Sequence, residues 1–426
     1  MNGITTERRR NTVIISNGHG KFHLIYAAQS AERHGILDQF ITAAYPTALL
    51  KRVLRVVTAI IPSDRLKRWM LREAEGVPGE KIRTCTLSEP FNQLAVKFPQ
   101  FGFNGSKQPQ LDALAFRIYQ RSALRYIRNS KAGLYHCRSG YGGKTISHAR
   151  SKGMVILVDH SIAHPQALMQ LIRNEGIYNP RLHVHLPPMW RLVQDDIETA
   201  DWILVNSDFV KKTMVDFGCP KDRIIVQYWG IDAEIEKYLE NTARTQRTDN
   251  SEMKFLFAGG VEKRKGADLL LDVIKKLPQH GWSFTLAGGI EQELKSKIGN
   301  IQNVNVKVLG AILRQDLIRL MLDHDVFVFP TLAEGSARVV FEAMASGMAI
   351  ITTPNAGSVV EHGKHGYLID PGNRESLYNA IMQCFDNRVG LKNFGLSARE
   401  LVQNQYHSAV YNDAMATLYS TLLTNK

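Results

Sequence analysis

Short apolar runs recur along this chain and alternate with segments whose apolar residues return every three or four positions. Runs of this length predict buried strands, and the spacing between them predicts amphipathic helices. Strands are predicted at 12–16, 40–45, 134–137, 154–158, 202–205, 224–227, 253–258, 282–287, 304–309, 326–329 and 348–352. Because strands that are apolar on both faces belong to covered parallel sheets, the alternation predicts an α/β protein.

The same pattern divides the chain into two halves. Gly230, Ile231 and Asp232 follow the first series of strands, and a polar stretch at 241–251 precedes the second series. We therefore predict two domains, 1–232 and 233–405, each with a Rossmann-like alternation of strands and helices. A last helical pattern, from residue 406 to 423, predicts a terminal helix within 406–426.

Two stretches of the first half depart from this alternation. Residues 76–110 contain four prolines among scattered aromatic residues, which predicts an irregular excursion. Residues 47–73 combine basic residues with apolar residues at helical spacing, and Pro62 divides them.

The basic stretch has two interpretations that stay open. A basic amphipathic helix can lie in a membrane interface, held by anionic lipid. It can equally pack its apolar stripe on the sheet and leave a solvated basic face. The concentration of charge favours membrane contact through Lys51, Arg52, Arg55, Arg65, Lys67, Arg68 and Arg72.

Charge is unevenly distributed between the halves. Residues 1–230 hold 32 of the 53 Lys and Arg but only 18 of the 40 Asp and Glu, a net charge of +14 against −1 for the remainder. An anionic membrane or another polyanion is the natural partner of such a half. No recognition motif for nucleic acid is present, so nucleic acid is not an expected partner.

Composition indicates a cytoplasmic location but does not distinguish between classes of globular protein. The chain has 426 residues and four widely separated cysteines, which we interpret as reduced thiols of a cytoplasmic protein. Arg8 to Arg10 precede only a short apolar run, which predicts a first strand rather than a signal peptide. No apolar run approaches the 18 or so residues of a membrane-spanning helix, so any membrane contact is expected to be peripheral.

The most informative stretch for chemistry is 329–366. A buried strand ends at Pro330, a loop carries Glu334 and Gly335, and a helix is predicted from Ser336 to residue 345. Open α/β sheets bind ligands at the carboxyl ends of their strands. Carboxylates such as Glu334 and Glu342 accept hydrogen bonds from hydroxyl groups, and amides at a helix start can bind a phosphate. Two solvated glutamates on an ordinary helix are the alternative.

Three further features carry candidate chemistry. Gly18 and Gly20 follow the first strand, where glycines let the backbone approach a ligand, although a tight turn explains them equally well. Lys263, Arg264 and Lys265 stand before a predicted helix, where cations oppose the helix dipole unless an anion lies between. His160 follows the central strand 154–158, and a histidine bonded within its own loop is the alternative.

The second half resembles the donor site of retaining GT-B glycosyltransferases of family 4, also called group 1. The matching motifs are Glu334 and Glu342 at E-x7-E spacing, the following AMASG, and GKHGYL at 363–368. Residues 198–232 of the first half match the family's pattern too. The resemblance implies Rossmann-like domains with parallel sheets facing across a cleft, and a C-terminal helix that crosses back to the first domain.

The resemblance also implies roles for individual residues. Lys265 would bind the donor diphosphate, Glu334 the sugar hydroxyls and Glu342 the ribose diol, while His160 would touch the sugar from the opposite domain. The implied catalytic residues are His160, Lys265 and Glu334. The implied donor-binding residues are Gly18, Gly20, Gly259, Lys263, Arg264, Lys265, Gly310, Glu334, Gly335, Ser336 and Glu342.

One position departs from the family's pattern. Family members place an arginine just after the first strand of the second domain, where this chain has Gly259 and Gly260. Lys263 or Arg264 would have to supply the missing cation. His183 and His185 have the spacing of metal ligands, but no third ligand follows, so no metal and no cofactor are expected.

The expected function is therefore transfer of a sugar, with retention, from a UDP- or GDP-sugar to a lipid-linked or surface-polysaccharide acceptor at the cytoplasmic membrane face. The alternative is a catalytically impaired GT-B scaffold that acts as a partner in glycan assembly. A nicotinamide-dependent enzyme fits poorly, because no G-x-G-x-x-G follows either domain's first strand.

Overall fold

The computed structural model describes residues 11–20, 23–43, 76–97, 108–242, 244, 252–301 and 305–424. Most of the expected linker at 241–251 and the whole basic stretch 47–73 lie outside these ranges, as do all seven residues predicted to contact a membrane.

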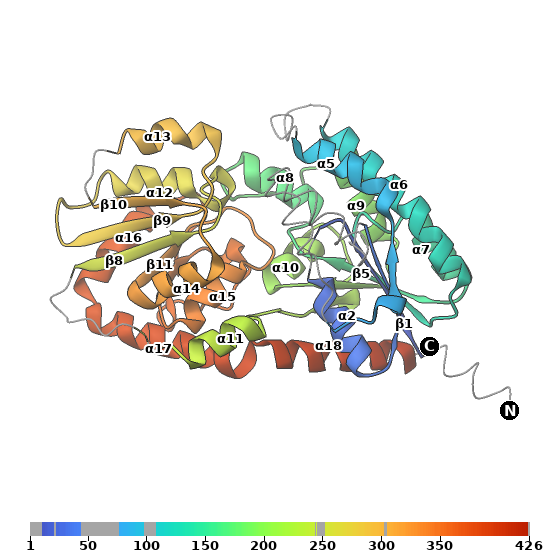
Figure 1. The fold of residues 1–426 in the computed structure, drawn as a ribbon. Coiled ribbons are helices and arrows are strands. Elements are labelled where there is room, and N and C mark those ends of the chain that lie inside the picture. Colours follow the sequence, from blue (N-terminus) through green and yellow to red (C-terminus); the bar gives the residue numbers. More distant parts are fainter. Residues whose placement is uncertain are drawn as a thin grey trace, which may run out of the picture.

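Two parallel sheets organise the described chain (Figure 1). The first is seven-stranded, in the order β3-β2-β1-β4-β5-β6-β7, and every neighbouring pair is parallel. Its strands are β1 (Val13–Gly18), β2 (Leu37–Thr42), β3 (Ile82–Thr84), β4 (Leu134–Arg138), β5 (Val155–His160), β6 (Trp202–Val205) and β7 (Ile224–Val226).

The second sheet is six-stranded, in the order β10-β9-β8-β11-β12-β13, and is also parallel throughout. Its strands are β8 (Met253–Ala258), β9 (Trp282–Ala287), β10 (Val306–Gly310), β11 (Val326–Phe329), β12 (Ala349–Thr352) and β13 (Gly366–Leu368). In each sheet the strand order reverses once, between β1 and β4 and between β8 and β11. Ligands of open α/β sheets bind at such reversals.

Helices cover both faces of the first sheet, which explains why its strands are continuously apolar. Side chains of β1, β4 and β5 alternate between two buried clusters. One lies beneath α2 (Leu24–Arg33) and α18 (Ser408–Thr424), and the other beneath α6 (Gln108–Asn129), α7 (Lys144–Ser151) and α9 (Pro188–Glu198). The helices that follow the first-sheet strands are α2 (Leu24–Arg33), α5 (Glu89–Lys97), α6 (Gln108–Asn129), α7 (Lys144–Ser151), α8 (Pro165–Arg173), α9 (Pro188–Glu198), α10 (Asp208–Asp216) and α11 (Ala233–Glu240).

One large apolar cluster forms the core of the second half. Its helices are α12 (Ala267–Ile274), α13 (Lys295–Gly299), α14 (Arg314–Asp323), α15 (Arg338–Ala345), α16 (Arg374–Asp386) and α17 (Arg388–Gln405). Residues 245–251, between α11 and β8, are among those outside the described ranges.

The terminal helix α18 (Ser408–Thr424) returns to the first half, as expected. In Figure 1, α17 runs beneath the second half and α18 continues beneath the first. Tyr411, Met415 and Tyr419 are buried with residues of α2 and β1. The hydroxyl of Tyr419 lies 2.8 Å from His136 Nδ1 on β4, which ties the helix to the sheet.

The prediction of an irregular excursion at 76–110 is wrong in part, because this stretch contains β3 and α5. Proline did not prevent either element. Pro78 precedes a single 3-10 turn, Gly79–Lys81, and Pro90 lies in the first turn of α5, where its missing N–H is not needed. β3 has only three residues and lies at the sheet edge.

Candidate active site

A cluster of charged side chains lies where the strand order of the second sheet reverses. Arg264 and Lys265 follow β8, and Glu334 follows β11. Arg264 Nη1 lies 2.8 Å from Glu334 Oε1, and Lys265 Nζ lies 4.0 Å from the same oxygen. Burial lowers the pKa of Arg264, but Glu334 and Glu262 outweigh this effect, so its pKa is raised and the guanidinium stays charged. The structure thus brings together three residues that the sequence selected separately.

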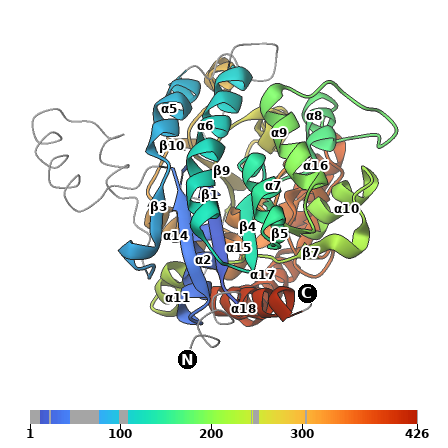
Figure 2. The ribbon, with the colours of Figure 1, turned by 90° about the vertical axis from the view of Figure 1, so that its right-hand side faces the viewer.

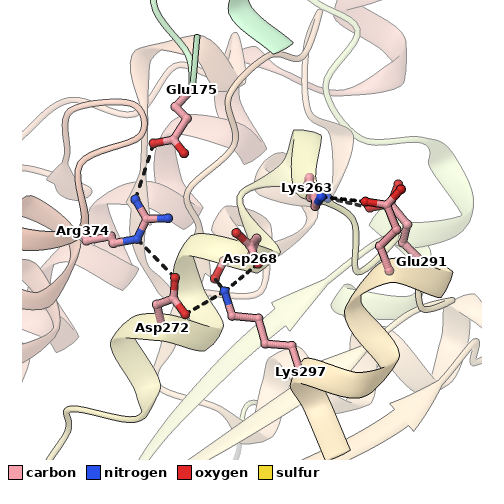
Figure 3. A network of polar contacts seen from close by, with 8 residues as sticks. Glu175, Lys263, Asp268, Asp272, Glu291, Lys297 and Arg374 are labelled. Carbon is pink, nitrogen blue, oxygen red and sulfur yellow. Dashed lines mark hydrogen bonds and ion pairs between the residues drawn. The ribbon is translucent and has the colours of Figure 1, made fainter. Parts of the chain in front are cut away.

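Lys263 faces away from this cluster. Its ammonium lies 2.6 Å from Glu293. Its backbone N–H donates to the carboxylate of Glu291 (Figure 3). Of the two cations considered for the missing family arginine, Arg264 is therefore the one beside Glu334.

Gly259 leaves room for the ammonium of Lys265. Gly259 has a φ of +111°, and a Cβ at this position would lie 3.1 Å from Lys265 Nζ. A side chain at 259 would crowd the ammonium, so the glycine that follows β8 keeps space free for Lys265.

The loop after Glu334 contacts the first half of the chain. A Cβ on Gly335 would lie 1.8 Å from the carbonyl oxygen of Ser161, so only glycine fits. The hydroxyl of Ser207 donates to the Gly335 carbonyl at 2.5 Å. The loop that carries Glu334 is consequently held against the first half through Gly335.

A cavity of about 430 Å³ adjoins this loop and has walls from both halves. Ser336 reaches it from the loop, Arg314 and Arg338 from the first residues of α14 and α15. The first half contributes His23, Tyr26, Asp159, Ser161, Asn206 and Trp229, and α18 contributes Tyr411.

Several buried polar atoms of this wall have no hydrogen-bond partner among the described residues. They are Nε1 of Trp229, the hydroxyl of Tyr411, Oδ1 of Asn206 and Nε of Arg338. Buried polar atoms are nearly always satisfied, so their concentration around one cavity favours a polar ligand or water there.

Two arginines of the cavity share one carboxylate. Arg314 donates to Asp232 at 2.5 Å and to Glu342 at 2.6 Å, and Arg338 donates to Asp232 at 3.0 Å. Burial and the charge of Arg314 lower the pKa of Arg338, whose guanidinium lies 3.6 Å from the ring centre of Trp229. Although burial alone would raise the pKa of Asp232, Arg314 lowers it, so Asp232 stays ionised.

Glu342 is 6% exposed and does not line the cavity; Arg314 lies there instead. The predicted contact of Glu342 with a ribose therefore needs either Arg314 as an intermediary or a rearrangement of this arginine.

Asp159, not His160, faces the cavity. Asp159 Oδ2 lies 2.8 Å from His23 Nε2 and 3.8 Å from His136 Nε2. Burial alone would raise the pKa of Asp159, but His23 and His136 outweigh it and lower the pKa, so the carboxylate stays ionised. Because neighbouring residues of a strand point to opposite faces, His160 points away from Asp159.

His160 is hydrogen-bonded to the protein through both ring nitrogens, once within its own loop, which is the alternative that the sequence left open, and once to Ser139 after β4. Its Nδ1 lies 2.9 Å from Ser139 Oγ and its Nε2 lies 3.2 Å from the Ala163 carbonyl. Its side chain is buried, and burial lowers its pKa to about 4. His160 does not line the cavity.

The predicted glycines lie at strand ends. Gly18 ends β1 against the ring of Tyr141, and Gly20 follows with open space where a Cβ would point. Gly310 ends β10, and its carbonyl accepts from Gly288 N at 2.7 Å.

Helix α15 starts at Arg338, two residues later than predicted, and has no side-chain cap. The backbone N–H groups of Glu334 and Ala337 already donate to the carbonyls of Asn355 and Ala356. Of the amides predicted near Ser336, these two are therefore occupied.

The sequence interpretation missed Arg314, Arg338, Asp159 and His23. Arg314 and Arg338 are the first residues of their helices, where a cation opposes the dipole. The same opposition between a cation and the helix dipole singles out the cations before α12, and it holds equally for these two arginines. Asp159 stands beside His160 in the sequence, and the choice between them depends on the phase of the strand.

Comparison with known proteins gave matches in both halves. The family model for Glycosyltransferase Family 4 matches residues 90–235, and that for Glycosyl transferases group 1 matches residues 252–387.

Related proteins are identical to this chain at about a quarter of the aligned residues. WcaL of Salmonella typhimurium, whose name assigns it a glycosyltransferase role in colanic acid biosynthesis, is 24% identical over 85% of this chain and 84% of its own length. The sulfoquinovosyl transferase SQD2 of Arabidopsis thaliana is 25% identical over 60% of this chain. That alignment spans only 52% of SQD2, about half of its length.

Solved structures of glycosyltransferases share the fold. A glycosyltransferase from Rickettsia africae superposes with a TM-score of 0.62 at 15% identity, covering 97% of this chain and 99% of that one. HepE of Anabaena, in complex with UDP and glucose, superposes with a TM-score of 0.58 at 16% identity, covering 96% and 100%. With the two parallel sheets, these matches confirm the predicted GT-B fold.

Proposed function

Because this chain belongs to the group 1 glycosyltransferases of family 4, we propose that it transfers a sugar from a nucleotide-diphosphate sugar to a saccharide acceptor, with retention at the anomeric carbon. The observation that carries the proposal is the cluster of Arg264, Lys265 and Glu334 at the strand-order reversal of the second sheet. It combines cations for a diphosphate with a carboxylate for sugar hydroxyls.

In this proposal the cations stabilise the leaving group. As the bond between the sugar and the diphosphate breaks, negative charge grows on the phosphate oxygens. Lys265 and Arg264 are already held in place, so they meet this charge without reorganising. Arg264 takes the role of the family's phosphate-binding arginine, in whose place this chain has Gly260. No metal is needed for this step in the proposal.

Glu334 orients the sugar by accepting hydrogen bonds from its hydroxyls. Glu342 contributes to ribose binding through Arg314, which donates a hydrogen bond to its carboxylate. Asp159 and His23 line the cavity that adjoins the Glu334 loop, from the side of the first half. We assign the sugar contact of the first half to this pair rather than to His160, whose ring nitrogens are bonded to Ser139 and Ala163.

Contact between the halves completes the proposed site. The approach of Gly335 to Ser161 brings the glutamate loop against the first half. Closing such a cleft excludes water, which would otherwise compete with the acceptor for the activated sugar.

The acceptor we propose is a lipid-linked or surface-polysaccharide saccharide. Support comes from WcaL and from CapM of Staphylococcus aureus, a capsular polysaccharide biosynthesis glycosyltransferase. The donor base is taken as uracil or guanine, and the UDP complex of HepE makes UDP-sugars the first to try.

The test is incubation of the purified protein with UDP- and GDP-sugars and a lipid-linked saccharide as acceptor, with the released UDP or GDP and the anomeric configuration of the glycoside product followed by NMR. The proposal expects nucleotide release that Glu334→Gln reduces by at least about a hundredfold, and a product with the donor's anomeric configuration. Failure of every donor to react would contradict it. An inverted product would contradict retention alone.

A non-catalytic scaffold is the second candidate. It is favoured by the pair of glycines at 259–260 and by the engagement of Glu342 with Arg314. If Glu334→Gln leaves the cell-surface glycan unchanged while deletion of the protein abolishes it, the scaffold is the correct description.

A further inference from the structure

Helix α6 presents a narrow basic face to solvent. Figure 2 views this side of the first half, with α6 beside α5. Leu114, Arg117, Arg121, Arg125 and Arg128 are all exposed, whereas Ala113, Ala115, Tyr119, Ala123 and Ile127 are buried. The exposed residues follow one another at intervals of three and four, so they lie along one face of the helix.

No acidic residue shares this face. The acid of α6, Asp112, projects about half a turn away, and burial raises its pKa to about 6. Within the described ranges none of the four arginines forms an ion pair. Arg125 donates to the Thr84 carbonyl and to Tyr126, both uncharged partners. None of the residues that the structure describes therefore neutralises the charge of this face.

Exposed leucines accompany the arginines. Leu114 lies on the same face of α6, and Leu87 and Leu94 belong to a 3-10 turn (Thr86–Ser88) and to α5, both of which contact α6. The exposed fractions are 73% for Leu87, 43% for Leu94 and 41% for Leu114. Apolar side chains next to a basic stripe are typical of surfaces that lie in a membrane interface.

The 3-10 turn is tied to the loop after β1. Ser88, next to Leu87, is buried and lies 2.8 Å from His19 Nε2, and His19, also buried, stands between Gly18 and Gly20. One hydrogen bond therefore connects the 3-10 turn with the glycine loop.

We propose that the exposed face of α6, with Leu87 and Leu94, is a docking surface for an anionic phospholipid bilayer. The arginines bind lipid phosphates and the leucines enter the interface, while no helix among the described residues is long and apolar enough to cross it. Charge complementarity and the accompanying leucines favour a bilayer over nucleic acid, which offers no apolar layer. The surface is distinct from the basic stretch 47–73.

The test is co-sedimentation of the full chain with phosphatidylcholine vesicles, with and without phosphatidylglycerol, at low and high salt. The variant Arg117→Glu/Arg121→Glu/Arg128→Glu carries the decisive substitutions. Its matched control is Arg181→Glu/Lys221→Glu/Arg223→Glu, which makes the same change in charge at exposed positions elsewhere in the first half.

The wild type and the control are expected to bind phosphatidylglycerol vesicles and to release them at high salt. The α6 variant is expected to bind at least about a hundredfold more weakly, since each of the three basic residues near an anionic surface contributes about fivefold. Substituting the same three arginines with lysine should retain most binding, which guards against misfolding as the cause.

Unchanged binding by the α6 variant, equal loss in the control, or binding that is insensitive to salt would each overturn the proposal. Binding of a DNA or RNA duplex in preference to the vesicles would overturn it too. The proposal rests on the proposed function only in its purpose, which is to bring the protein to a lipid-linked acceptor. Release of UDP or GDP from the donor, measured without vesicles, should be the same in the α6 variant and the wild type. Loss of vesicle binding therefore bears on the docking surface alone, and absence of nucleotide release bears on the proposed function alone.

Discussion

Lys263 and Lys265 are separated by one residue, but their ammonium groups lie beside different carboxylates. Lys265 lies beside Glu334 at the strand-order reversal, while Lys263 lies 2.6 Å from Glu293 on the far side of the same turn. The sequence identified both as cations before a helix but held no information on which way each side chain turns. The direction follows from the 3-10 turn at 263–265, whose successive residues project about a third of a turn apart.

This contrast predicts unequal effects of two similar substitutions. Lys265→Met should reduce the rate of nucleotide release by about 10²–10³, the usual effect of removing one donor to a developing anion. Lys263→Met should stay close to the wild type. Steady-state rates with a saturating donor measure both, and equal losses would contradict the assignment of Lys265.

The choice between Asp159 and His160 is also decided at the scale of one residue. The sequence predicts correctly that polar groups leave β5 at its carboxyl end, but the face that each one takes depends on the phase of the strand. A buried neutral histidine has a further consequence for stability. Burial lowers the pKa of His160 to about 4, so the unfolded chain binds the proton first as the pH falls.

Stability that depends on neutral His160 should therefore be present above the unfolded pKa of about 6.5 and be lost as the pH falls toward 4. Between pH 7 and 5 this residue alone should remove about 2 kcal/mol. Urea unfolding at both values compares the wild type with His160→Gln, which should lose less stability on acidification. The same pH dependence in both would show that His160 is not the group that titrates.

At the scale of elements, the loop between β11 and α15 connects the donor site to the opposite half. Its motif was recognisable in the sequence, because Glu334, Gly335 and Glu342 have a fixed spacing. Its contact with Ser161 was not, since that residue lies 174 positions away in the chain. The β3 and α5 elements were missed for a different reason: each is short, and prolines at tolerated positions resemble prolines in loops.

Gly335→Ala should loosen the contact between the halves. The added Cβ would lie 1.8 Å from the Ser161 carbonyl oxygen, a backbone atom that cannot move aside cheaply. Small-angle scattering should report a larger radius of gyration, and donor affinity should fall. Gly299→Ala, with nothing within 4 Å of its Cβ, serves as the control. An unchanged radius and affinity in Gly335→Ala would mean that the contact does not hold the halves together.

At the scale of the molecule, the two parallel sheets were predictable because both are buried on both faces and so leave continuous apolar runs. The return of α18 to the first half was predictable only from the family resemblance. In physical terms it depends on Tyr411, Met415 and Tyr419 entering the cluster under α2, and their apolar spacing does not specify which cluster receives them. How the halves meet depends on contacts between distant residues, such as Arg374 with Glu175 (Figure 3).

Met415→Ala should test the contribution of α18 to the first half. The side chain is fully buried, so truncation should cost about 2–5 kcal/mol of unfolding free energy. Thr417→Ala, at an exposed position of the same helix, should change the free energy by less than about 0.5 kcal/mol. Urea denaturation measures both. Equal stability of the two variants would mean that α18 adds little to the first half.

We propose that a nucleotide-diphosphate sugar binds beside Arg264, Lys265 and Glu334. Titration calorimetry of UDP and GDP compares the wild type with the variant Arg264→Gln/Lys265→Gln. We predict saturable binding of one nucleotide that the double variant weakens by at least about a hundredfold, and that Lys263→Gln leaves intact. Absence of binding by both nucleotides, or equal affinity in the double variant, would contradict it.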